Sequence, residues 1–103
     1  MTTRPPFKRV PKEEIRQLFN DGDYWSQAKS GRLIDKLFWQ GHPSPQRSGE
    51  PPCTRSQIVS YFDSKGREIA RVHQYLRKDG TLGGSGRPDP KKLFHEGVLY
   101  GAL

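Results

Sequence analysis

The sequence predicts an α+β domain in which two N-terminal helices pack on one face of a small antiparallel sheet. Apolar residues recur at helical spacing in the first forty positions, and a β-hairpin pattern follows over residues 57–77. A length of 103 residues fits one domain. Residues 1–10 are basic and interrupted by proline, so we expect a flexible basic arm there, followed by a single domain over 11–103.

The first predicted helix covers residues 11–20. Pro11 suits the first helical position, and the two glutamates that follow it lie where the helix dipole favours acidic groups. Ile15, Leu18 and Phe19 form one apolar stripe. A helix of this length is marginal alone in water, so the stripe must pack against the rest of the domain.

The second predicted helix runs from about residue 30 to 40 and ends at Gly41, which suits a helix C-terminus. Trp25 and Trp39 flank it and are expected to pack against it. Its apolar positions, at helical spacing, are Leu33, Ile34, Leu37 and Phe38.

The hairpin over residues 57–77 turns at Asp63-Ser-Lys-Gly66, which suits a type I turn with glycine in a bulge. If Phe62 lies opposite Glu68, alternation assigns every other side chain to one face. The predicted core face carries Ile58, Phe62, Ala70, Val72 and Leu76. The opposite face carries Val59, Tyr61, Ile69, Arg71, His73, Tyr75 and Arg77.

The remaining segments are irregular or short. Residues 41–56 hold four prolines and form the predicted long loop, in which His42, Arg47 and Arg55 are expected to be solvated. Leu82 can begin a strand. The glycines of 83–86 can form a backbone nest for one phosphate, with Arg87, Lys91 and Lys92 close in sequence. Residues 89–95 are predicted to form a single helical turn, and 98–100 a terminal strand.

Composition limits the classes of function. Eighteen Lys and Arg against eleven Asp and Glu give a net charge of +7, which favours an acidic partner, most often nucleic acid. A single cysteine, Cys53, excludes an internal disulfide framework, and with three scattered histidines it argues against a metal site. We predict no cofactor. No apolar run approaches the length of a membrane span, so we expect a cytoplasmic protein without membrane contact.

The strand over residues 67–77 carries the candidate functional residues. We assign His73, Arg71 and Tyr75 to a catalytic group, because imidazole can take and give a proton near neutral pH and arginine can bind phosphate. The residues expected to bind nucleic acid are Arg77, Lys78, Tyr61, Arg87, Lys91 and Lys92. If His73 is not the catalytic base, His42 and His95 are the next candidates.

The element order and the strand Arg71-Val-His-Gln-Tyr-Leu-Arg77 resemble small ribonuclease toxins of the RelE and barnase/EndoU/colicin type. The resemblance covers most of the chain by order alone and includes no exact motif. It implies metal-independent RNA cleavage on an open sheet face, in which a base activates the 2′-hydroxyl and cations hold the charge on phosphorus.

Two other classes use the same face. A non-catalytic RNA- or DNA-binding module would stack bases and hold phosphates there without an acid/base pair. A protein-interaction adaptor would present exposed aromatics and a sheet edge to an acidic protein partner. RNA is preferred over DNA as the nucleic-acid partner.

Overall fold

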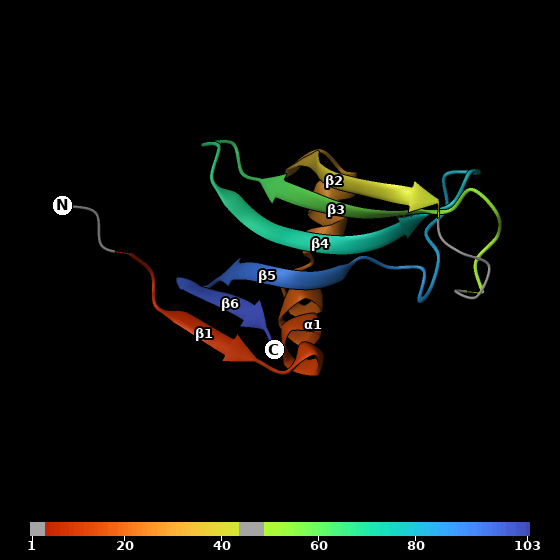
Figure 1. Ribbon diagram of the computed structural model, residues 1–103. Coiled ribbons are helices and arrows are strands. Elements are labelled where there is room, and N and C mark those ends of the chain that lie inside the picture. The colour runs from red at the N-terminus through yellow and green to blue at the C-terminus, as the bar shows by residue number, and fades with distance from the viewer. Residues whose placement is uncertain (1–3, 44–48) are drawn as a thin grey trace.

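The computed structural model describes residues 4–43 and 49–103, and these form one mixed sheet with two short helices (Figure 1). The strand order across the sheet is β1-β6-β5-β4-β3-β2. β1 and β6 are parallel, and every other neighbouring pair is antiparallel. The elements in chain order are β1 (Phe7–Val10), α1 (Lys12–Asp21), α2 (Tyr24–Lys29), β2 (Ile34–Pro43), β3 (Arg55–Phe62), β4 (Glu68–Leu76), β5 (Asp89–His95) and β6 (Val98–Ala102).

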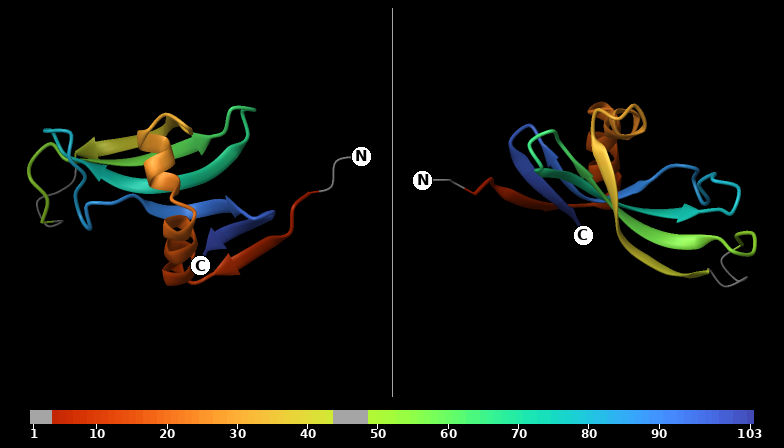
Figure 2. Two further views of the ribbon diagram at one scale, coloured as in Figure 1. Left: turned by 180° about the vertical axis from the view of Figure 1, so that it is seen from behind. Right: turned by 90° about the horizontal axis from the view of Figure 1, so that it is seen from above.

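The predicted fold class, two N-terminal helices on a small antiparallel sheet, is wrong. The described residues form a six-stranded mixed sheet, and β1 precedes both helices in the chain. Residues 7–10, expected in a flexible arm, pair in parallel with β6. Both helices lie on the same side of the sheet, and the opposite face carries no helix in the described part of the chain (Figure 2).

The segment predicted as the second helix, about residues 30–40, is instead the turn after α2 and most of β2, an edge strand. Leu33 enters the core, whereas Ile34, Leu37 and Phe38 are each more than half exposed. The helical spacing of these residues was therefore not a sign of a buried helical stripe. Paired with β3, they alternate between the two faces of the sheet, with a register shift around Phe38.

The predicted β-hairpin is present, but its register shifts within it. Phe62 pairs with Glu68 as expected, and Tyr61 then pairs with Ala70, which leaves Ile69 as an extra residue. This bulge moves every later pair by one position. Ala70 and Val72 remain on the core face, while the β3 residues that join them are Val59 and Tyr61 rather than the expected Ile58 and Phe62.

The core lies between α1 and the helix-covered face of the sheet. Ile15 and Phe19 from α1 are almost fully buried, and the Phe19 ring lies 6.2 Å from the Tyr61 ring. Val72 and Leu93 are fully buried beneath them. The apolar stripe predicted for the first helix is confirmed in this respect, since its side chains pack on the sheet.

The C-terminal segment is two strands. Residues 89–95, expected to form a helical turn, are β5, which pairs with both β4 and β6. Pro90 is tolerated in this strand at a register shift between β4 and β5, where an irregular ladder does not need its missing N–H group. The predicted terminal strand is confirmed as β6. Leu82 makes only an isolated bridge to Leu76.

Candidate functional site

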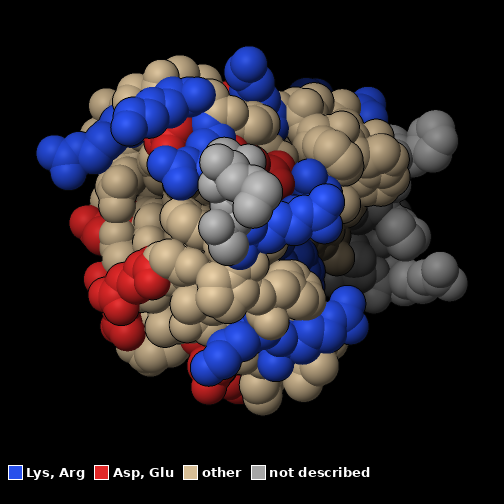
Figure 3. All heavy atoms as spheres, turned by 90° about the vertical axis from the view of Figure 1, so that its left-hand side faces the viewer, with Lys and Arg blue, Asp and Glu red and all other residues tan. Residues whose placement is uncertain are grey.

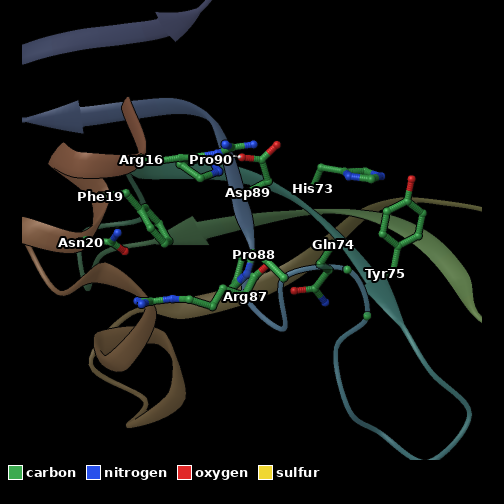
Figure 4. A pocket seen from close by; sticks show the side chains of 13 residues that line it. Arg16, Phe19, Asn20, His73, Gln74, Tyr75, Arg87, Pro88, Asp89 and Pro90 are labelled. Atoms are coloured by element: carbon green, nitrogen blue, oxygen red, sulfur yellow. Dashed lines mark hydrogen bonds and ion pairs between the residues drawn. The ribbon is translucent and has the colours of Figure 1, made fainter. Parts of the chain in front are cut away.

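A cleft of about 410 Å³ opens where β5 separates from β4 (Figure 4). Its walls come from the end of α1, from β4 and from the glycine-rich turn that precedes β5. The polar residues that line it are Arg16, Asn20, His73, Gln74, Tyr75, Ser85, Arg87 and Asp89. The cleft therefore brings together two guanidinium groups, one imidazole and one carboxylate. They belong to Arg16, Arg87, His73 and Asp89.

His73 lies on the face of β4 opposite the core and borders the cleft beside Tyr75. The two rings meet edge to face, with centroids 4.8 Å apart, and His73 Nε2 lies 2.7 Å from Ser56 Oγ on β3. Burial lowers the pKa of His73, and the Lys91 ammonium lowers it further, against an opposing effect of Asp89. His73 is therefore held towards its neutral form, which can accept a proton.

Asp89 is the carboxylate of the cleft, and it joins α1 to β5. Arg16 Nε donates to Asp89 Oδ1 at 2.8 Å, and Lys91 Nζ lies 2.9 Å from Oδ2. Burial opposes ionisation of Asp89, but the bonds from Arg16 and Lys91 outweigh it and hold its pKa below the ordinary value. Asp89 thus orients two cations at the margin of the cleft.

Arg87 comes from the turn before β5 and reaches towards α2, where its Cζ atom lies 5.2 Å from the centre of the Trp25 ring. Its guanidinium and that of Arg16 give the cleft positive charge on two walls (Figure 4). A guanidinium binds phosphate through several N–H groups at once. The cleft can therefore hold an anionic group close to an imidazole and an aromatic ring.

The glycine-rich turn binds a carboxylate of the protein itself rather than the predicted phosphate. Glu50 Oε1 accepts a hydrogen bond from the Gly84 N–H at 2.6 Å, and Glu50 Oε2 lies 3.0 Å from Arg77 Nε. A side chain at Gly83 would meet the Glu50 carboxylate, since its Cβ would lie 2.5 Å from it. The nest thereby fixes the wall of the cleft, and Arg77 is engaged in the same contact.

The other predicted site residues are divided among several places. Arg71 forms a paired contact with Glu68 on the open face, outside the cleft, and Lys92 lies 3.8 Å from the same carboxylate. Lys78 is exposed in the turn after β4. Tyr61, expected on the functional face, is 3% exposed in the core, and burial raises its pKa. Of the predicted residues, the cleft thus brings together His73, Tyr75 and Arg87, with Lys91 at its margin.

Of the two alternative histidines, His95 lies outside the cleft. His95 lies at the far end of β5, where its Nδ1 atom is 2.7 Å from the Tyr24 hydroxyl. The side chain of His42 and all of Arg47 lie outside the described residues. His73 is therefore the histidine that the described structure places at a polar cleft.

Sequence reasoning missed Arg16, Asp89 and Glu50. Arg16 was visible only as the polar face of a predicted helix, and its partner is 73 positions away in the chain. Asp89 was placed at the start of a predicted helical turn, and Glu50 in the predicted long loop. No local pattern marks these residues, because each acts through a contact with a distant element.

Comparison with protein-family models, with curated proteins and with solved structures found no match to this chain. Within residues 4–43 and 49–103, no group of three or more His, Cys, Asp or Glu side chains is arranged to hold a metal ion. No helix formed by the described residues is long and apolar enough to cross a membrane.

Proposed function

We propose that this protein binds nucleic acid, with RNA preferred over DNA, and cleaves RNA at the cleft without a metal ion. The observation that carries the proposal is the placement of His73 and the Tyr75 ring at one cleft with Arg16 and Arg87. The cations suit a phosphate, the ring suits a base, and the imidazole suits proton transfer. The net charge of +7 favours the same partner.

In the proposed reaction, neutral His73 removes the proton of a ribose 2′-hydroxyl. The 2′-oxygen then forms a bond to phosphorus as the bond to the 5′-oxygen breaks, which leaves a cyclic phosphate and a 5′-hydroxyl. Arg16 and Arg87 hold the negative charge that grows on the phosphoryl oxygens. The Tyr75 hydroxyl, in the same cleft, can supply the proton that the leaving oxygen takes.

The proposal keeps the activity implied by the resemblance to small ribonuclease toxins, with the basic histidine-containing strand as its support, since the observed element order differs from the expected one. It requires no cofactor. It assigns the protein to the cytoplasm, where RNA substrates are present. Arg71, proposed from the sequence as a catalytic cation, is replaced in this role by Arg16 and Arg87, because Arg71 is bound to Glu68 outside the cleft.

The test is incubation of purified protein with labelled RNA and DNA in EDTA, on a gel that reports binding and cleavage together. Wild-type protein should cleave RNA and leave DNA intact, since DNA lacks the 2′-hydroxyl. His73→Ala should lower cleavage by roughly 10²- to 10⁴-fold, as expected for removal of a general base. Its RNA affinity should change by less than about threefold, because neutral imidazole neutralises no phosphate.

Arg87→Ala should lower both binding and cleavage. Arg32→Ala is the matched control, because Arg32 is exposed, carries the same charge and does not line the cleft. Circular dichroism establishes that each variant is folded. Binding without any cleavage in the wild type would replace the ribonuclease by a non-catalytic RNA-binding module, and equal losses in Arg87→Ala and Arg32→Ala would remove the cleft from the proposal.

A further inference from the structure

The face of the sheet opposite the helices carries a patch of alternating cations and aromatic rings. Lysine and arginine side chains gather at the end of the sheet that carries the β3–β4 and β5–β6 turns (Figure 3). On this face β2, β3, β4 and β5 contribute side chains to one continuous surface. We call it the open-face patch, and it consists of Lys36, Phe38, Phe62, Arg67, Arg71, Lys92 and Phe94.

Three cations of the open-face patch lie over phenylalanine rings. Arg71 Cζ is 4.2 Å from the centre of the Phe38 ring. The corresponding distances are 5.4 Å for Arg67 and Phe94, and 5.6 Å for Lys36 and Phe62. Stacking of this kind holds a cation in place beside the ring. Arg71, Arg67 and Lys36 are therefore positioned by contacts within the patch.

The charge of the open-face patch is positive. Glu68 lies among these cations, contacting Arg71 at 3.1 Å and Lys92 at 3.8 Å, and Arg67 also contacts Asp63 in the turn. Phe38 remains 59% exposed although it contacts Arg71. An exposed ring beside cations in excess of carboxylates fits a ligand that presents flat aromatic groups and phosphates together.

The open-face patch continues into the cleft through β4. Arg71 and His73 are two residues apart on this strand and point to the same face, so their backbones lie about 7 Å apart. Trp39 and Ile58 complete the row that leads to His73, since Trp39 pairs with Ile58 and Ile58 pairs with His73. Trp39 is half exposed. One extended ligand can thus contact the patch and the cleft together.

At the other end of the open-face patch there is a hollow of about 550 Å³. Its charged lining residues are Arg4, Arg67, Lys92 and Glu68, and Phe94 and Leu99 provide apolar walls. Its size suits a single nucleobase with its sugar and phosphate rather than a second helix. The hollow gives the surface an end point for a strand that begins at the cleft.

We propose that the open-face patch binds unpaired nucleotides, so that the substrate of the cleft is single-stranded RNA. This inference rests on the proposed function of the cleft. Bases in a duplex are stacked on each other and present no free face to a phenylalanine ring, whereas an unpaired strand presents both its bases and its phosphates. The patch then selects the strand, and His73 acts on the part of it that reaches the cleft.

The experiment compares a 12-nucleotide single strand with a hairpin RNA of the same composition, both bound to protein in the His73→Ala background to prevent cleavage. The single strand should bind more tightly than the hairpin. Phe38→Ala should weaken binding of the single strand by about five- to hundredfold, because stacking on one base contributes about 1–3 kcal/mol, and it removes no charge. Leu37→Ala is the control, since Leu37 is equally exposed on the same strand but pairs on the helix-covered face.

A dinucleotide substrate separates this inference from the proposed function, because it fills the cleft alone. Phe38→Ala with His73 intact should cleave the dinucleotide at the wild-type rate and cleave the 12-mer more slowly at low concentration. If Phe38→Ala cleaves both substrates at wild-type rates, the inference that the open-face patch binds the substrate is overturned, and the proposed reaction at the cleft stands. If the wild-type protein cleaves neither substrate but binds the single strand in a way that Phe38→Ala weakens, the proposed reaction is overturned and binding by the open-face patch stands. A further outcome is that sedimentation shows a concentration-dependent dimer that is absent in Phe38→Ala. The patch would then bind a second copy of this chain, and the inference would be overturned.

Discussion

The Glu50 carboxylate accepts the backbone N–H of Gly84 at 2.6 Å, and this contact ties the segment before β3 to the turn that forms one wall of the cleft. The Gly84 N–H bond and then the Arg77 guanidinium hold the pKa of Glu50 below its ordinary value. The turn has room for this carboxylate because Gly83 has no side chain. The Glu50 carboxylate of the same chain therefore fills the anion-binding site that the glycine-rich turn forms.

Glu50→Gln should loosen the glycine-rich turn, because the neutral amide is a weaker acceptor and does not attract Arg77. We expect faster hydrogen exchange at the Gly84 amide and a lower urea midpoint at pH 7. Since the folded-state pKa of Glu50 is depressed, its contribution to stability is present above the unfolded-state pKa and is lost as pH falls through the folded-state pKa. The difference between wild type and variant should therefore shrink in acid. Glu96→Gln, on a side chain that is 85% exposed, should leave Gly84 exchange unchanged.

The bulge at Ile69 places Val59 on the core face and Ile58 on the open face, which two lysine substitutions can test. Val59→Lys should prevent cooperative folding, because it places an unpaired charge in the core, at a cost of several kcal/mol against a total stability of about 5–15 kcal/mol. Ile58→Lys adds the same charge one position earlier, on the open face, and should leave a folded protein. Thermal unfolding followed by circular dichroism distinguishes them. A folded Val59→Lys variant together with an unfolded Ile58→Lys variant would place Ile58 on the core face and contradict the bulge.

Substitutions at the neighbouring positions Val72 and Arg71 of β4 should differ in their effect on stability, because the two side chains lie on opposite faces of the sheet. Val72→Ala should lower the free energy of unfolding by about 1–3 kcal/mol, since Val72 is fully buried and its truncation leaves a cavity. Arg71→Ala should lower it by less than 1 kcal/mol, as its contact with Glu68 is partly exposed. Urea denaturation measures both. Equal losses would mean that Arg71 has a packing role on the open face.

The proposed role of His73 requires a particular pH dependence. Because the folded-state pKa of His73 lies below 6.5, RNA cleavage should rise with pH through a midpoint below 6.5 as the imidazole becomes neutral. Lys91→Ala removes a cation that lowers this pKa and should move the midpoint to higher pH. Asp89→Asn removes the carboxylate that raises it and should move the midpoint to lower pH. NMR titration of the His73 ring measures the same shifts without relying on cleavage, and Lys65→Ala, in the exposed turn, should have no effect.

Binding to RNA should weaken steeply with salt, because each phosphate that the protein neutralises releases a counterion. We expect a slope of roughly −3 to −5 in log affinity against log salt concentration. Arg87→Ala should reduce the magnitude of the slope by about 1, and Arg32→Ala should leave it close to the wild-type value. Fluorescence anisotropy over 50–300 mM salt gives both slopes. A salt-independent affinity would contradict binding through phosphates.

Local sequence determined the elements whose stabilising contacts are close in the chain. Asp63 accepts the N–H groups of Lys65 and Arg67, so the hairpin turn is defined within five residues. The alternation of Val72 with Arg71 and His73 assigned the two faces of β4 correctly. His73 and Tyr75 could be placed together for the same reason, because residues two apart on a strand share a face.

Tertiary contacts decided the remainder. The segment around Leu37 has helical spacing, yet it pairs with β3 in an antiparallel ladder with two register shifts, and as a strand it needs no buried helical stripe. Residues 7–10 form a strand that pairs in parallel with β6, some ninety positions later in the chain. The cleft depends on long-range packing as well: Arg16 reaches Asp89 because α1 packs on β5. Sequence periodicity reports which side chains share a face, whereas the identity of the neighbouring element is set by the packing of the whole chain.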